Sequence, residues 1–332
     1  MSKHSPNKRR SPKEIKKVLV LGGAGFLGSN LVRYCLAKGA KVVVVDSLHP
    51  LFKSVKTNLK NVIDEITFIK GDIRDADLLK KVIPGQDIIF NCAAQTSHPI
   101  SLQDAILDTE INCLGNLRVL SAVKDYNPEA VILYTSSSTV VGKAIHDIID
   151  EHHGEKPLEI YSANKGVAEK YYRIYNNLYG LKTIVLRFAN LYGPFGKNYP
   201  EFGFVNYFIN QSARGKTIQI YGEGNQSRNL MFVDDASDIM WRAVEEPKLI
   251  GESYFAAHHE HFNVRQIAEI VAKTFKSKPP KLIPWPEMRK KIEVDNVLIS
   301  SARLHYLTGW RPKYSLAEGL KLTKKRMLSK SY

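Results

Sequence analysis

The segment KVLVLGGAGFLG at residues 17–28 decides the fold of this chain. Its first five residues are rich in Val and Leu, as in a buried strand, and Gly22, Gly25 and Gly28 follow at intervals of three. Glycine allows a tight turn at the first of these positions, approach of backbone amides to a phosphate at the second, and close helix–strand packing at the third. Helical spacing of apolar residues continues over 29–39. The segment therefore predicts the strand, turn and helix that begin a dinucleotide-binding unit.

Strand-like and helix-like segments then alternate along the chain. The β-rich runs are 41–46, 66–72, 87–93, 130–136 and 183–189, and helical stretches lie near 74–83, 101–125 and 158–179. Such alternation predicts right-handed crossovers between parallel strands. We expect an α/β fold built on a Rossmann-type, doubly wound parallel sheet.

The composition changes after residue 190, where LYGPFGKNYPEFG is dense in Gly, Pro and aromatic residues, as in a loop over a site. A helix is expected over 203–214 and a short strand over 217–220. The expected division is a basic disordered tail at 1–15, a Rossmann domain at 16–189 plus 229–258, and a small discontinuous α/β domain at 190–228 plus 259–332.

The formal net charge of +15 is concentrated at the two ends of the chain. Residues 1–17 hold seven basic residues against one acidic residue, and residues 313–332 hold six against one. A solvated tail and a solvated helix face explain this pattern, and no nucleic-acid-binding motif accompanies it. No apolar run approaches the roughly 18–20 residues of a membrane helix. We expect a cytoplasmic protein with neither a membrane nor a specific nucleic-acid partner.

The cysteines give no sign of a disulfide framework or a metal site. Cys35, Cys92 and Cys113 lie far apart and form no CxxC pair. Their number and spacing fit a reducing compartment. We expect no metal.

Acidic residues after the second and third strands predict the identity of the dinucleotide. Asp46 ends the second strand, 18 residues after Gly28, where a carboxylate accepts both ribose hydroxyls. It would repel a 2′-phosphate, which favours NAD over NADP. Asp72 follows the third strand and is placed either to accept the adenine amino group, with Ile73 against the ring, or to serve as a helix N-cap or turn aspartate.

Tyr161 and Lys165 are the candidate catalytic pair, because they lie four apart in a helical segment and share one face. A nearby ammonium and the positive nicotinamide ring are expected to lower the pKa of the phenol. The phenolate would then take a hydroxyl proton while hydride leaves the same carbon. The serines at 136–138 end the fifth strand; one hydroxyl there would donate to the reacting oxygen, unless the cluster only caps the next turn.

Taken in order, VLGGAGFLG, Asp46, GDI, NCAAQ, SSSTVVG, YSANK and RFANLYGP resemble the extended short-chain dehydrogenase/reductase family. The branch is that of the NAD-dependent epimerase/dehydratase enzymes, which act on nucleotide sugars, and the resemblance covers about residues 16–325. It implies a nucleotide-diphosphate sugar as substrate and a homodimer formed through the helices at 101–125 and 158–179.

The resemblance also assigns roles to residues. It implies the catalytic residues Ser137, Tyr161 and Lys165. It implies NAD contacts at Gly22, Gly25, Phe26, Leu27, Gly28, Asp46, Asp72, Ile73, Ala93, Tyr161 and Lys165. It implies substrate contacts at Gln95, Ser137, Ser138, Asn190, Arg228 and Arg289.

The same resemblance bears on the reaction. Dehydratases of the family carry an Asp-Glu pair directly after the catalytic Ser/Thr, and decarboxylases carry a glutamate at the second position; here these positions are Ser138 and Thr139. That leaves a 4-epimerase acting through a transient 4-keto sugar, with tightly bound NAD as hydride carrier. A reductase or dehydratase of the family, or a non-catalytic dinucleotide-binding protein, remain alternatives. Val141 and Asn229 replace the family's usual tyrosine and aspartate, which leaves the sugar open.

Several polar residues keep two interpretations. The loop QTSHP at 95–99 is expected to face the sugar, although His98 is more simply a loop hydrogen-bonder than a catalyst. Asn112 would carry a water-linked proton path or bind backbone. Asp234 and Asp235 look like acids that cap the N-terminus of a helix.

Overall fold

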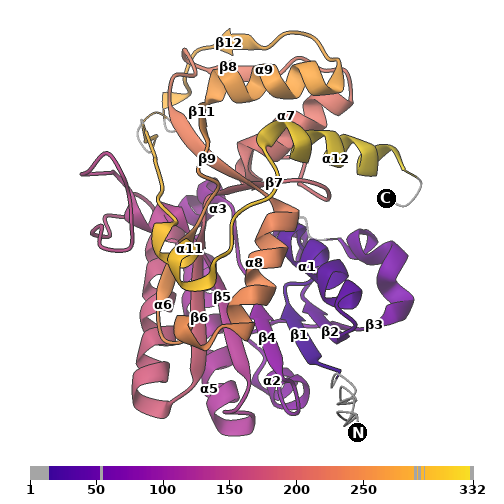
Figure 1. Ribbon diagram of the computed structural model, residues 1–332, viewed down its shortest axis with the longest axis vertical. Coiled ribbons are helices and arrows are strands. Elements are labelled where there is room, and N and C mark those ends of the chain that lie inside the picture. Colours follow the sequence, from indigo (N-terminus) through magenta and orange to yellow (C-terminus); the bar gives the residue numbers. More distant parts are fainter. Residues whose placement is uncertain (1–14, 53–54, 288–289, 291–292, 295, 330–332) are drawn as a thin grey trace, which may run out of the picture.

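The computed structural model describes residues 15–329 apart from 53–54, 288–289, 291–292 and 295 (Figure 1). The basic tail expected at 1–15 falls outside the described residues except for its last position, and so does Arg289.

A sheet of seven parallel strands forms the centre of the molecule, in the order β10-β6-β5-β4-β1-β2-β3. The strands are β1 (Lys17–Leu21), β2 (Lys41–Asp46), β3 (Ile66–Lys70), β4 (Ile88–Asn91), β5 (Val131–Ser137), β6 (Lys182–Phe188) and β10 (Ser253–Ala256). Runs such as KVVVVD suit strands that are covered on both faces. The order confirms the predicted Rossmann-type sheet and adds one edge strand, β10.

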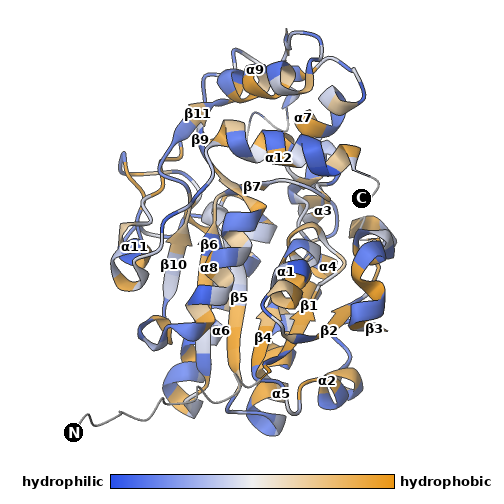
Figure 2. Ribbon diagram, turned by 45° about the vertical axis from the view of Figure 1, so that its right-hand side comes forward, coloured by the Kyte–Doolittle hydropathy of each residue, from blue (hydrophilic) through white to orange (hydrophobic). Residues whose placement is uncertain are grey.

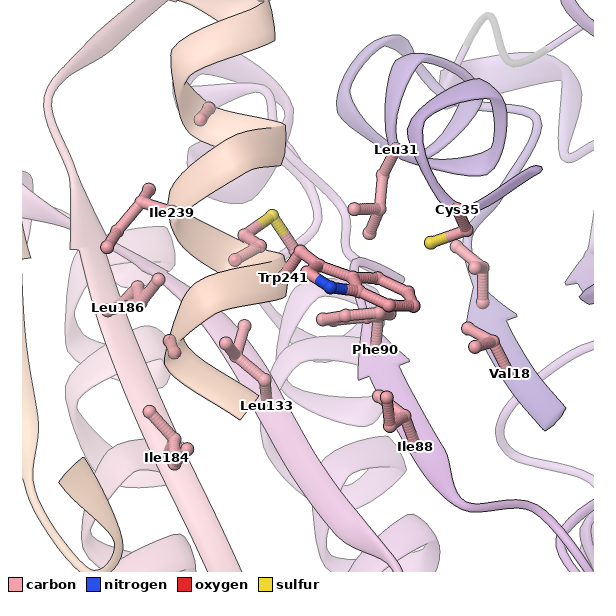
Figure 3. Close-up of a cluster of buried hydrophobic side chains, with 14 of the residues drawn as sticks. Val18, Leu31, Cys35, Ile88, Phe90, Leu133, Ile184, Leu186, Ile239 and Trp241 are labelled. Carbon is pink, nitrogen blue, oxygen red and sulfur yellow. The ribbon is translucent and has the colours of Figure 1, made fainter. Parts of the chain in front are cut away.

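Helices cover both faces of this sheet. One face packs against α1 (Phe26–Ala37) and α8 (Val233–Glu245), with Trp241 of α8 between Leu31 and Phe90 (Figure 3). The opposite face packs against α2 (Ala76–Val82), α5 (Asn116–Tyr126) and α6 (Ile160–Tyr179). The central strands are strongly hydrophobic, whereas the helices carry polar outer faces (Figure 2). No helix of the described part of the chain is long and apolar enough to span a membrane.

The single helix predicted over 101–125 is interrupted in the structure. It consists of α3 (His98–Gln103), α4 (Ala105–Thr109), a π-helical segment η3 (Glu110–Gly115) and α5. Asp104 leaves helical geometry between α3 and α4, and its side chain accepts the Leu107 N–H at 2.9 Å. Within the π-helical segment, Asn112 binds both the N–H and the C=O of Gln95, at 3.1 and 2.9 Å. This geometry agrees with the backbone-binding interpretation of Asn112.

A second group of elements gathers at the carboxyl end of the sheet and forms a cap with its own core (Figure 1). A three-stranded sheet contains β7 (Asn190–Tyr192), β9 (Ser227–Phe232) and β11 (His261–Asn263), and a two-stranded sheet contains β8 (Gln219–Tyr221) and β12 (Lys281–Ile283). Helices α7 (Phe204–Ala213), α9 (Val264–Phe275) and α12 (Leu316–Leu328) pack around them. The 3-10 helices connect the larger elements. They are η1 (Pro50–Phe52), η2 (Lys56–Glu65), η4 (Ser138–Val141), η5 (Pro200–Phe202) and η6 (Pro247–Leu249).

One segment expected in the cap belongs to the central core instead. Helix α11 (Ala302–Thr308) packs on β10, and Leu304 and Trp310 are fully buried in the cluster that contains Trp241. The Trp310 indole N–H donates to Asp238 of α8 at 2.8 Å. Because this large aromatic side chain is buried against the sheet, its segment belongs to the central core although cap segments flank it in the sequence.

Candidate active site

A pocket lies between the carboxyl ends of the strands and the cap. On the sheet side it is lined by the ends of β1, β2, β4 and β5 and by the start of α1. On the cap side it is lined by Asn190, Leu191, Lys197, Phe202, Gly203, Val205 and Asn206. Ligands bind at this edge of doubly wound sheets, because the loops there diverge and leave a crevice.

The glycine turn shapes one end of the pocket. Gly22 has φ +76°, and a Cβ there would approach the Ala93 backbone to 2.7 Å; a Cβ on Gly28 would approach the Gly22 carbonyl oxygen to 2.2 Å. Gly25 precedes α1 with no side-chain cap, so the backbone N–H groups of the first turn have no side-chain acceptor. The turn and the positive end of α1 line the pocket, and they fit the diphosphate of a dinucleotide.

Asp46 is fixed in the same pocket by the turn around it. One carboxylate oxygen accepts the Ala24 N–H at 3.0 Å and the other accepts the Leu48 N–H at 2.8 Å. The side chain is buried, and burial raises the pKa of the carboxyl although these N–H bonds oppose the change. A carboxylate that is held this rigidly fits a ribose diol, because it accepts both hydroxyls.

Asp72, Ile73 and Ala93 also line the pocket. Asp72 forms an ion pair with Arg74 at 2.9 Å, whereas Asp75 caps α2. Although burial opposes it, the hydrogen bonds from Arg74 hold the pKa of Asp72 below its usual range. Asp72 accepts the Arg74 backbone N–H at 2.9 Å, as a turn aspartate does, and it also lines the pocket.

Tyr161, Lys165 and Ser137 meet at the opposite end of the pocket. The first two lie on the opening turns of α6, and Ser137 ends β5. The Lys165 ammonium donates to the Thr135 carbonyl at 2.8 Å and lies 5.9 Å from the centre of the Tyr161 ring. Burial raises the pKa of the phenol, and the nearby Ser137 hydroxyl acts against this rise. The structure therefore brings the three expected catalytic residues together.

The charge states of this pair differ from the expectation. Burial raises the pKa of Tyr161, the Glu159 carboxylate adds to the rise, and together they outweigh the effect of the Ser137 hydroxyl. Burial also lowers the pKa of Lys165 to about 8. The protein's own groups therefore raise the pKa of the phenol, because desolvation disfavours its charged form, and the predicted lowering depends on the nicotinamide ring.

His98 and Glu159 form an unexpected pair beside Tyr161. Their Nδ1 and Oε1 atoms are 3.0 Å apart, and the imidazole meets the Tyr161 ring edge-on with centres 4.9 Å apart. Glu159 caps α6, accepting the N–H groups of Tyr161 and Ser162 at 3.0 Å each. Although burial opposes it, hydrogen bonds from His98, Ser162 and Ser101 keep the pKa of Glu159 low. His98 therefore has two roles: it binds Glu159, and it also lines the pocket.

The expected substrate contacts divide into two groups. Ser137 and Asn190 line the pocket. Gln95 does not: it is fully buried, and its amide donates to the Ser97 carbonyl at 2.8 Å and to Asp108 at 2.7 Å. Ser138 is buried at the start of η4, also outside the pocket lining.

Arg228 is likewise directed away from the pocket lining. Its guanidinium pairs with Glu293 and donates to the Val294 carbonyl at 2.7 Å. These contacts join β9 to the segment before α11. Protein partners therefore take the polar groups of Gln95 and Arg228, and Ser138 is buried outside the pocket lining.

Asp234 and Asp235 connect α8 to the C-terminal region. Asp234 pairs with Arg326, and Asp235 accepts the N–H groups of Lys313 and Tyr314 at 2.9 and 3.2 Å. Both carboxylates lie in the first turn, but the cap position is Phe232. Among the residues that the structure describes, no cluster of three or more His, Cys, Asp or Glu side chains could hold a metal ion.

Comparisons with known proteins identify the family of the chain. Residues 18–264 match the model of the NAD-dependent epimerase/dehydratase family. The chain is 31% identical over 324 residues to UDP-glucose 4-epimerase of Mycolicibacterium smegmatis, covering 95% of this chain and 99% of that one.

Solved structures give the same result. The UDP-glucose 4-epimerase of Thermus thermophilus in complex with NAD superposes with a TM-score of 0.83 at 28% identity, covering 93% of this chain and 98% of the other. A dTDP-glucose 4,6-dehydratase from Streptomyces venezuelae with NAD bound gives 0.84 at 27% identity, covering 93% and 96%. The chain belongs to the NAD-dependent epimerase/dehydratase family, a branch of the extended short-chain dehydrogenases/reductases, and its cofactor is NAD.

Proposed function

We propose that this protein is a nucleotide-sugar 4-epimerase. The observation that carries the proposal is the meeting of Tyr161, Lys165 and Ser137 at the end of the pocket away from the glycine turn. NAD, when bound, supplies reversible removal of hydride from a sugar carbon. The residues of the chain bind the sugar, orient its hydroxyl and move its proton.

Each member of the trio has a distinct task. Tyr161 takes the proton from the 4-hydroxyl and returns it after the sugar has presented its other face. Ser137 donates to the reacting oxygen and so holds it close to the phenol. Lys165 places its ammonium 5.9 Å from the centre of the Tyr161 ring, and this charge, together with the positive nicotinamide ring of bound NAD, favours the phenolate.

The residues after Ser137 argue against the other reactions of the family. Thr139 accepts from the Ser162 hydroxyl at 2.7 Å and lies 2.9 Å from the Ser137 hydroxyl oxygen, so it belongs to a neutral hydroxyl chain. Ser138 is buried outside the pocket lining. Elimination of water needs an acid and a base here, and neither side chain ionises near neutral pH. Return of hydride needs no further acid or base, which favours epimerisation.

The sugar is placed between His98 and Asn190. Both line the pocket, and Glu159 holds one nitrogen of the imidazole, which leaves the other for a sugar hydroxyl. The amide of Asn190 is at 3.4 Å from the Asn229 carbonyl, so it is only weakly engaged by the protein.

A panel of UDP-, GDP-, CDP- and dTDP-sugars, analysed by NMR, tests the proposal. We expect one substrate to yield its C4 epimer with no net change in absorbance at 340 nm. Tyr161→Phe should lower turnover by on the order of 10²–10⁴. A 4-keto-6-deoxy product, steady consumption of NADH or NADPH, or full activity of the variant would each overturn the assignment.

We also propose that the protein is a homodimer, as the family resemblance implies. Apolar side chains lie exposed along α4, η3 and α6, including Ile106, Leu114, Ile174 and Leu178. These elements pack side by side on one flank of the sheet. An apolar flank of this kind suits a self-complementary interface.

A further inference from the structure

Lys197 is a cation in the NAD pocket that no motif predicted. It follows β7 in the Gly- and Pro-rich loop and lines the pocket from the cap side. Its ammonium lies 4.1 Å from the centre of the Phe202 ring. Among the residues that the structure describes, it has no ion-pair partner within 4.0 Å and donates no hydrogen bond. Burial lowers its pKa to about 8, and the Asp46 carboxylate favours its charged form.

The loop that carries Lys197 is fastened to the helix that begins at the phosphate-binding turn. Asn30 of α1 donates to the Pro194 carbonyl at 3.0 Å, in a buried position, and to the Phe26 carbonyl at 2.8 Å. One turn farther on, the Arg33 guanidinium lies 4.2 Å from the centre of the Phe195 ring. The loop therefore runs beside the first turns of α1, whose N-terminus lines the same pocket.

The cap holds the other side of this loop. Asn210 of α7 donates to the Gly196 carbonyl at 3.0 Å, and Asn206 accepts the Gly193 N–H at 3.1 Å. Phe195, between these points, has φ +62°, a left-handed conformation that a phenylalanine seldom adopts. Contacts on both sides thus fix the backbone that positions Lys197.

A half-buried ammonium that pairs with no carboxylate of the described residues within 4.0 Å is unfavourable, so the position favours binding of an anion. The pocket offers two anion-binding features, the ammonium and the N-terminus of α1 with its uncapped first turn. Asp46 already serves the ribose end. We propose that Lys197 binds the diphosphate of NAD from the cap side, so that the loop at 193–198 fastens the cofactor between α1 and the cap. The proposal holds whichever sugar reaction the enzyme catalyses.

The test compares Lys197→Met and Lys197→Arg with Lys216→Met, a matched control at an exposed lysine after α7. NAD content per chain is measured after gel filtration. The NAD-depleted form of each protein is then titrated with ADP and with adenosine by calorimetry. ADP carries the diphosphate, whereas adenosine reports the ribose and adenine contacts alone.

We expect K197M to retain less NAD and to bind ADP about tenfold or more weakly, as loss of a charged hydrogen bond does. Adenosine should bind as in the wild type, K197R should restore most of the ADP affinity, and K216M should change neither. Unchanged ADP binding by K197M would overturn the proposal. So would an equal loss for ADP and adenosine, because this result would place the ammonium at the ribose or the adenine.

Discussion

Burial acts on Tyr161 and Lys165 in a way that makes each side chain resist its working charge. The phenol's pKa is raised and the ammonium's is lowered to about 8. If stability alone mattered, apolar side chains would be more favourable at these two positions. Keeping the pair therefore lowers the free energy of unfolding for the sake of function, and this loss can be measured.

Lys165→Met should make the protein more stable at pH 7 while abolishing turnover. The folded pKa of about 8 lies below the ordinary value of 10.5, so the folded chain binds fewer protons than the unfolded chain between these values. The destabilisation is complete below pH 8 and disappears as the pH rises to 10.5. This penalty amounts to about 3 kcal/mol for the buried ammonium of the wild type. The variant escapes it but loses ~1 kcal/mol with the hydrogen bond to Thr135.

Urea unfolding of both proteins at several pH values between 7 and 10 checks this. The wild type should approach the variant in free energy of unfolding as the pH rises. A variant that is less stable at pH 7, with a constant difference across the range, would show that burial does not penalise the ammonium.

The sequence predicts the site well where residues act through local spacing. Gly22, Gly28 and Asp46 follow from strand, turn and helix signals, and Tyr161 and Lys165 from helical spacing. Gln95 could not be placed in this way, because Asp108, thirteen positions away, holds its amide inside the protein. Lys197 could not be found either, since its position depends on the docking of its loop onto α1.

At the level of elements, a buried ion pair holds the catalytic helix against the sheet. Glu169 lies one turn after Lys165 on α6 and pairs with Arg187 of β6 at 2.6 Å. Ser136 of β5 donates to the same carboxylate. The two charged side chains are 4% and 7% exposed, so each depends on the other for its solvation.

Arg187→Met should therefore destabilise the protein by about 3–5 kcal/mol, because it leaves the Glu169 carboxylate buried without its cation. The double variant R187M/E169Q should recover much of that loss. Lys182→Met is the matched control: its exposed pair with Glu129 at 2.8 Å should contribute under about 1 kcal/mol. Urea unfolding measures all three. Equal losses for R187M and the double variant would contradict the argument.

Element boundaries show where periodicity stops being informative. The strands from β1 to β6 match their predicted ranges closely, because continuous β-branched runs are typical of buried parallel strands. The helix expected over 101–125 is interrupted because Asp104 caps a new helix and Asn112 turns to bind the backbone of Gln95. Apolar spacing predicts which face of a helix is buried, but it does not reveal where side-chain hydrogen bonds interrupt the helix.

At the scale of the whole molecule, one flank of the sheet remains apolar. Ile106 of α4 is 73% exposed and Ile174 of α6 is 45% exposed. Helices α4 and α6 contact each other, so the two side chains lie on neighbouring helices. If the proposed homodimer forms through this flank, introducing like charges on both helices should separate the two protomers, because two copies of each carboxylate would face each other without water.

The double variant I106E/I174E should therefore elute as a monomer of 37.5 kDa in light scattering, whereas the wild type should have twice that mass. Ile148→Glu is the control, since Ile148 is 64% exposed but lies in the loop after η4, away from this flank. The monomer should keep its bound NAD, because the pocket is lined by residues of one chain. A wild type of 37.5 kDa, or a double variant that stays paired, would refute dimerisation through α4 and α6.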